Sequence, residues 1–262
     1  HFGHLAGQNV VCDVFARYHR LKGNKVLMVS GSDCHGAPAE LEAHNQNLEP
    51  KELAQKTHEE IKETFDKLSF LYDNYTTTMT ENHKEVVQNF FKVLDKNKYL
   101  TIKKTTQYYD PEAKRFLPDR YVKGTCPKCE NSNARGDECP ECGEFLSPED
   151  LTEPYSAISN VKPVLRKTQH YYMNFSKTSK ELKNWIEKNS SSWRKWVKAS
   201  TLGFLKTGLK PRAVTRDINF GVPVPVEGWE EKSIYVWIEA VVGYLSASIE
   251  WSSNRENQSE WE

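Results

Sequence analysis

The sequence predicts an α/β fold in which an open parallel sheet is interrupted by a β-rich insertion with a pair of cysteine knuckles. Three observations support this. The apolar run at residues 26–29, bounded by Gly31, is typical of a buried parallel strand. Residues 233–238 predict a second such strand, followed by a helix through Tyr244 and Leu245. Between them, short β-like runs broken by proline and glycine replace the alternation of strands and helices.

Composition limits the possible functions. The chain has 262 residues, enough for one large domain or two ordinary ones. Its 36 basic and 36 acidic residues cancel, so any contact with RNA must be a local patch. No apolar run approaches the roughly 20 residues that a membrane helix needs. Without an export signal, and with four of its 6 cysteines clustered, the chain is expected in the cytoplasm, with no membrane partner.

The first segment combines two imidazoles with a helix start. His1 and His4 flank Gly3, and apolar residues then recur at helical spacing as far as Leu21, before Gly23. Free N–H groups at a helix N-terminus attract a phosphate, and glycine allows a close approach. The alternative is a solvated N-terminal segment. Such a helix normally follows a strand, which is absent here, so we expect the chain to be a fragment.

Asp33 and His35 follow the first strand directly. Ligands bind beyond the carboxyl ends of parallel strands, so we expect both residues beside the segment 1–4. The alternative, weighed equally, is that they cap the next helix.

Two scaffold helices should come next. The first starts at Pro50, with a buried stripe of Leu53, Thr57, Ile61, Phe65 and Leu68. After an extended segment at 76–80, Thr80 should cap a helix from Glu81 to about Asn97. Its inward side chains are expected to be Val86, Phe90, Val93 and Leu94.

The insertion begins near Tyr99. We expect strands at 101–109, 120–123, 156–158 and 171–175, then helices after Ser176. The stretch 188–216 is rich in lysine and arginine, interleaved with tryptophans. It is either an RNA-facing surface or, more often in proteins, a solvated face with its core stripe. The predicted domains are 1–98 and 216–262 for the sheet-containing part and 99–215 for the insertion.

Two C-x-x-C knuckles give the strongest local signal. Cys126 and Cys129 are separated by 9 residues from Cys139 and Cys142. Four thiolates at this spacing complete a tetrahedron around Zn²⁺ and leave no open position, which predicts a structural zinc. Free or redox cysteines are the alternative. Cys12 and Cys34 lie outside the pattern.

Four motifs together resemble the methionyl-tRNA synthetases. His-Phe-Gly-His at 1–4 is similar to the family's His-Ile/Leu-Gly-His, and residues 31–36 are similar to its Gly-Ser-Asp-x-His-Gly. Residues 116–129 resemble the entry to its zinc knuckle, and 235–240 resemble its Tyr-Val-Trp-x-Asp-Ala strand end. The resemblance implies a Rossmann-type parallel sheet, incomplete at both ends, with a β-rich zinc-knuckle insertion.

The resemblance also implies roles. His1 and His4 would bind the ATP phosphates with Gly3 under the adenine, Mg²⁺ would accompany ATP, and Arg216 would lie near the reacting groups. Asp33 would hold the methionine ammonium. The residues lining the thioether pocket would be Trp237, Ala240 and Tyr244. The parent would form methionyl-adenylate and esterify tRNA(Met), and the isolated fragment is expected to be inactive.

The chain departs from the family pattern at three positions. Phe2 replaces Ile or Leu, Glu239 replaces Asp, and Val241 replaces a common Pro. The family's pyrophosphate-holding Lys-Met-Ser-Lys-Ser loop and its anticodon-binding helices are absent from the sequence. Two alternatives therefore stay open: a zinc-ribbon RNA-binding module and a diverged, non-catalytic synthetase paralogue.

Overall fold

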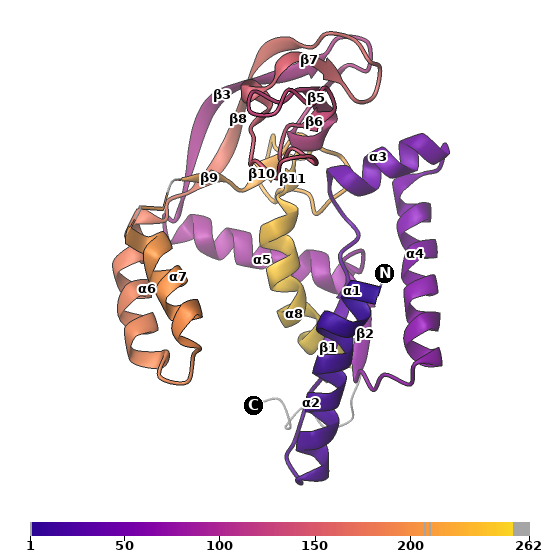
Figure 1. Cartoon of the computed structure of the whole chain (residues 1–262), viewed down its shortest axis with the longest axis vertical. Helices are drawn as coiled ribbons and strands as arrows, with labels where there is room; N and C mark the ends of the chain where they lie inside the picture. The colour runs from indigo at the N-terminus through magenta and orange to yellow at the C-terminus, as the bar shows by residue number, and fades with distance from the viewer. Residues whose placement is uncertain (1, 207, 210, 254–262) are drawn as a thin grey trace.

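A parallel pair of strands builds the part of the chain that holds the predicted first strand. The computed structural model describes residues 2–206, 208–209 and 211–253. In it, β1 (Val29–Ser32) pairs with β2 (Asn74–Thr77) in parallel, so the carboxyl ends of both strands meet at one edge. The crossover between them consists of α3 (Ala37–Gln46) and α4 (Pro50–Lys67), as Figure 1 shows. The first strand is thus confirmed, three residues later than predicted.

The first helix is continuous over three segments: α1 (Phe2–His4), a π-helical turn η1 (Leu5–Asn9) and α2 (Val10–Leu21). The predicted helix is confirmed, but its apolar side chains are exposed, Leu21 by 88%. The helix is held instead by polar residues. Asp13 is buried and its Oδ1 accepts a hydrogen bond from the Leu71 amide at 2.8 Å. Arg20 Nη1 donates to Leu71 O at 3.1 Å.

The second scaffold helix, α5 (Glu81–Lys96), begins as predicted, because the Thr80 side chain accepts a hydrogen bond from the His83 amide at 3.1 Å. Its predicted inward face is right only in part: Val86 and Leu94 pack against the core, but Phe90 is exposed. The buried residues are His83, Val87 and Phe91, whereas Val93 is 54% exposed.

The stripe predicted on α4 needs the same correction. Its buried residues are Ala54, His58 and Phe65, while Thr57 and Leu68 are exposed. A histidine occupies the inward face of both helices, and an apolar pattern cannot detect it.

Two antiparallel sheets build the insertion at the top of Figure 1. In the larger sheet, β3 (Leu100–Asp110) and β8 (Val164–Met173) form a long ladder flanked by β4 (Arg115–Phe116) and β9 (Arg212–Ala213).

The smaller sheet places β5 (Val122–Thr125) between β6 (Ala134–Arg135) and β7 (Thr152–Ser156). Short 3₁₀ turns, η2 (Asp119–Tyr121) and η3 (Pro148–Asp150), precede β5 and β7. Of the predicted strands, 101–109 is confirmed. β5 overlaps the strand predicted at 120–123 and β8 overlaps the one predicted at 171–175, each with shifted ends. The prediction for 156–158 is wrong beyond Ser156, where β7 ends in a turn.

Two helices, α6 (Ser176–Asn189) and α7 (Lys195–Lys206), leave the insertion on one side of the molecule (Figure 1). Ile186 is buried, but Trp185 and Trp196 are 55% and 66% exposed. The helices were predicted; their tryptophans do not form a core stripe.

The last strand prediction is largely wrong. β11 (Ser233–Ile234) is two residues long and pairs antiparallel with β10 (Thr215–Arg216), with one further bridge from Ser233 to Pro223. α8 (Val236–Ser253) starts two residues after β11. The amides of Ile238 and Glu239 both donate to Tyr235 O, which begins the helix. α8 packs against α5 and β1. A helix apolar around much of its circumference cannot be told from a buried strand by periodicity.

A buried carboxylate joins the insertion to α3. Glu40 Oε1 accepts the Phe220 amide at 2.7 Å, and its Oε2 accepts Arg115 Nη2 at 2.6 Å and the Tyr121 hydroxyl. Tyr121 lies in the insertion's hydrophobic cluster, which Ala37 of α3 also joins. Among the described residues, no helix has the length and apolar character to cross a membrane.

Candidate active site

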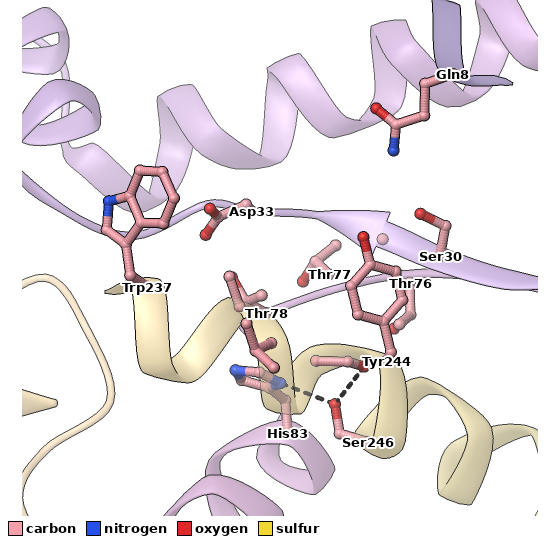
Figure 2. A pocket seen from close by; sticks show the side chains of 14 residues that line it. Gln8, Ser30, Asp33, Thr76, Thr77, Thr78, His83, Trp237, Tyr244 and Ser246 are labelled. Carbon is pink, nitrogen blue, oxygen red and sulfur yellow. Dashed lines mark hydrogen bonds between the residues drawn. The ribbon is translucent and has the colours of Figure 1, made fainter. Parts of the chain in front are cut away.

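A cavity of about 400 Å³ opens at the carboxyl edge of β1 and β2. One wall comes from α8, and Gln8 of η1 reaches in from the first helix (Figure 2). The lining residues are Gln8, Ser30, Gly31, Asp33, Thr76, Thr77, Thr78, His83, Trp237, Ala240, Val241, Gly243, Tyr244 and Ser246. The position agrees with the rule that ligands of parallel sheets bind beyond the strand ends.

Asp33 follows β1 directly and presents its carboxyl group to this cavity (Figure 2). Desolvation by the surrounding protein, and then the charge of Glu239, raise the pKa of Asp33 to about 6, although His35 and His83 act in the opposite direction. The alternative that Asp33 or His35 caps the next helix is wrong. The N-cap of α3 is Gly36, at φ 100°, and no side chain caps it.

Three predicted pocket residues, Trp237, Ala240 and Tyr244, line the cavity together. Their spacing places them on one face of α8, a helix where a strand end was expected. Trp237 is 72% and Tyr244 56% exposed, so both rings border open space.

Sequence reasoning missed several lining residues. Thr76, Thr77 and Thr78 stand at the end of β2 as Asp33 does at the end of β1, so the strand-end rule applied to the predicted segment 76–80 would have found them. Gln8 lies one helical turn after His4, and the signal for it was weak. His83 gave no signal, because its ring reaches the cavity from the buried face of α5.

A second cavity of about 440 Å³ adjoins the first and shares Asp33 and Trp237 with it. It is lined by Arg216, which does not line the first cavity. The Arg216 guanidinium lies 3.8 Å from the centre of the Tyr235 ring, and its Nε donates to Asp119 Oδ2 at 3.1 Å. These contacts fix the arginine between the insertion and α8.

The described part of the histidine motif lines neither cavity. His1 lies outside the described residues, and neither Gly3 nor His4 is among the described residues that line the two cavities. Gly3 and His4 both belong to the first turn of a helix, and both residues are exposed. The first helix reaches the Asp33 cavity through Gln8.

Four cysteines form a second, separate site in the insertion. The Sγ atoms of Cys126, Cys129, Cys139 and Cys142 all lie within 4.8 Å of one another. The pairs Cys126–Cys142 and Cys129–Cys139 are 3.9 and 3.6 Å apart. A regular tetrahedron with Zn–S bonds of 2.3 Å has edges of about 3.8 Å, and a disulfide needs about 2.05 Å. The arrangement fits four thiolates around one zinc ion.

The other two cysteines stand apart from this cluster. Cys12 is exposed on α2, and Cys34 is buried beside Asp33. Burial raises the pKa of the Cys34 thiol to about 11, so it behaves as a small neutral side chain.

The whole chain matches one protein family. A family model described as tRNA synthetases class I (M) matches residues 1–262. The chain belongs to this family. Its sequence is 46% identical over 247 residues to a methionine–tRNA ligase of Parabacteroides distasonis, which covers 94% of the chain and 36% of that relative. It is 43% identical over 262 residues to one of Dehalococcoides mccartyi, covering 100% of the chain and 47% of that relative.

Solved structures of this synthetase family show the same fold. A Mycobacterium tuberculosis methionyl-tRNA synthetase bound by methionyl-adenylate superimposes with a TM-score of 0.69 at 19% identity, over 94% of this chain and 44% of that one. A second structure, also with methionyl-adenylate, gives a TM-score of 0.70 at 18% identity, over 98% and 45%. The chain thus spans less than half the length of the synthetases compared here.

Proposed function

We propose that this chain is part of the catalytic core of a methionine–tRNA ligase. The parent protein would activate methionine with ATP to methionyl-adenylate and transfer it to tRNA(Met). The observation that carries this proposal is the cavity at the β1–β2 edge, where Asp33 faces the aromatic side chains of α8. The 42–46% identity to curated methionine–tRNA ligases supports the same conclusion.

The cavity suits methionine in both its polar and its apolar parts. An α-ammonium group would pair with Asp33, and a thioether chain would lie against Trp237, Ala240 and Tyr244. Aromatic and aliphatic walls favour a flexible, polarizable side chain. A volume of about 400 Å³ is within the range of small-molecule sites.

ATP would bind beside this cavity. We assign its phosphates to His1 and His4, its adenine to Gly3, and Arg216 to the charge that develops near the α-phosphate. Mg²⁺ would accompany the nucleotide. Attack of the methionine carboxylate on the α-phosphorus needs positioning and charge neutralisation and no protein nucleophile.

We assign a structural zinc to Cys126, Cys129, Cys139 and Cys142. The thiolate distances support a closed tetrahedral site, which stabilises the insertion without reacting with a substrate. A cytoplasmic location fits a partner of tRNA and a reduced zinc–thiolate site.

Methionine-dependent exchange between pyrophosphate and ATP tests the proposal in the full-length protein. We expect exchange with methionine and much less with leucine or valine. A full-length protein that binds tRNA but shows no amino-acid-dependent exchange would be an RNA-binding module or a non-catalytic paralogue.

A further inference from the structure

A buried carboxylate contacts one lining residue of each cavity and has no part in the function assigned above. Glu239 of α8 is 0% exposed. Its Oε1 contacts His35 Nδ1 and lies 3.3 Å from His83 Nε2. Its Oε2 is buried and, among the described residues, has no hydrogen-bond partner. We call His35, His83 and Glu239 the Glu239 cluster.

The His83 ring lies between two hydrogen-bonding partners, Ser246 and Glu239. The Ser246 hydroxyl donates its single proton to Gly243 O at 3.0 Å. The same hydroxyl oxygen lies 2.8 Å from His83 Nδ1, and Figure 2 shows this pair below the cavity. On the other side of the ring, His83 Nε2 lies 3.3 Å from Glu239 Oε1, a contact that is attractive only if Nε2 carries a proton. An imidazolium at His83 would donate to both Ser246 and Glu239, and the inference below assigns His83 this form.

The carboxylate should be ionised as well. Burial alone would raise the pKa of Glu239, but hydrogen bonds and charge from His35 and His83 outweigh it and lower that pKa. An ionised Glu239 without its histidines would leave a buried negative charge close to Asp33. Two carboxylates that share one site cannot both stay ionised easily.

The Glu239 cluster acts on Asp33 from two directions. His35 is two residues along the chain, and His83 lines the same cavity from α5. Glu239 disfavours the ionised form of Asp33, and both histidines favour it. Removing one histidine would therefore leave the Glu239 charge less compensated.

We propose that the Glu239 cluster is a charge-compensating unit that keeps Asp33 ionised and ready for an amino-acid ammonium group. His83 and Glu239 are then positioning residues for amino-acid recognition. This inference rests on the proposed function, because it concerns the same cavity. In this arrangement the Glu239 charge acts on the two histidines through Oε1, while Oε2 makes no hydrogen bond among the described residues.

Other ionisable side chains border the same space. Those that share a cavity with Asp33 are Tyr244, Asp119, Arg120, Asp137, Arg216 and Tyr235. Arg120 and Arg216 are paired with Asp137 and Asp119. The Cys34 thiol is adjacent to Asp33, and Lys51 and Lys84 line a third cavity with His35. The test therefore changes only the charges of the Glu239 cluster.

The test compares His83→Gln with the double variant His83→Gln/Glu239→Gln in the full-length protein. The readout is kcat/KM for methionine in ATP–pyrophosphate exchange between pH 5 and 8. In the single variant the Glu239 charge is less compensated, which raises the pKa of Asp33. The acid limb of the kcat/KM profile should therefore move to higher pH by about one unit, which lowers kcat/KM about tenfold near pH 5. The double variant removes both charges, so its acid limb should return toward that of the wild type.

His170→Gln is the matched control. His170 is also fully buried and its Nε2 lies 3.0 Å from the Asp217 carboxylate, but it lines neither cavity. It should lower stability and leave the acid limb in place. An active wild type whose acid limb does not move in His83→Gln, or moves further in the double variant, overturns the inference. A wild type without exchange contradicts the proposed function instead.

A measurement without a variant covers the case in which His83→Gln does not fold. In full-length protein labelled with ¹⁵N-histidine, His83 should show two protonated ring nitrogens at pH 7.5. A neutral His83, with one unprotonated nitrogen, would overturn the inference.

Discussion

At the scale of single residues, the proposed function makes the ionisation of Asp33 decide when the cavity can hold an ammonium group. Its pKa is raised to about 6, chiefly by desolvation, so the carboxyl group is charged above that pH and protonated below it. In the full-length protein, methionine affinity should be nearly constant above about pH 7. It should weaken by about tenfold between pH 7 and pH 5. Calorimetric titrations across this range would measure it, and a flat profile down to pH 5 would contradict the assignment.

His4 has a different expected signature. A donor used mainly on the transition-state phosphate changes the rate and not the binding of the amino acid. His4→Ala in the full-length protein should slow adenylate formation, by roughly a hundredfold if it removes one such donor, and leave the methionine Kd within about twofold. Single-turnover kinetics and equilibrium titration separate the two. Lost methionine affinity with an unchanged maximal rate would show that His4 does not serve ATP.

Short-range rules predicted some single residues correctly. Thr80 caps α5, and Asp33 stands at a strand end, because both positions follow from the local sequence. The burial and pairing of His83 and Glu239 could not be predicted. They are buried polar residues whose partners lie 163 and 204 positions away, and helical periodicity places only apolar side chains inward.

At the scale of elements, the cysteine knuckles should control the folding of the insertion. Metal binding energy is local folding energy, so Cys139→Ser should lose the zinc and unfold mainly the segment from Tyr99 to about Thr215. Hydrogen exchange should increase in β5, β6 and β7 and change little in α5. Elemental analysis of the wild-type protein should give one zinc per chain, and finding none would defeat this assignment. A Cys12→Ser variant, altered at an exposed cysteine outside the cluster, is the matched control.

The same scale shows where sequence patterns are ambiguous. The insertion strands were recognised from alternation and turn residues, with shifts of a few residues at their ends. The strand prediction for 233–238 is wrong beyond Ile234, because β-branched and aromatic residues in an apolar run fit a strand and a buried helix equally well. Packing against α5 and β1 favours the helix α8 over a strand, and the residues of α5 and β1 are distant from α8 in the sequence.

At the scale of the whole molecule, the site is assembled from four separate segments. Gln8, the end of β1, the end of β2 with His83, and one face of α8 meet at the same cavity. The strand-end rule predicted that a cavity would lie at this edge, and the resemblance to a synthetase family pointed to the α8 residues that line it. The sequence alone could not show which helix would close the cavity, or that Arg216 would occupy the adjoining one.

The central claim is that this cavity recognises an amino acid through Asp33. Asparagine keeps the size of Asp33 and removes its charge, and a charge-assisted contact is worth roughly 1.5–3 kcal/mol. The most direct test is therefore a methionine titration of the full-length protein and its Asp33→Asn variant at pH 7.5. We expect a Kd that rises about ten- to a hundredfold, at 1.4 kcal/mol per factor of ten, with nearly unchanged ATP affinity. A variant that binds methionine as tightly as the wild type would contradict the claim.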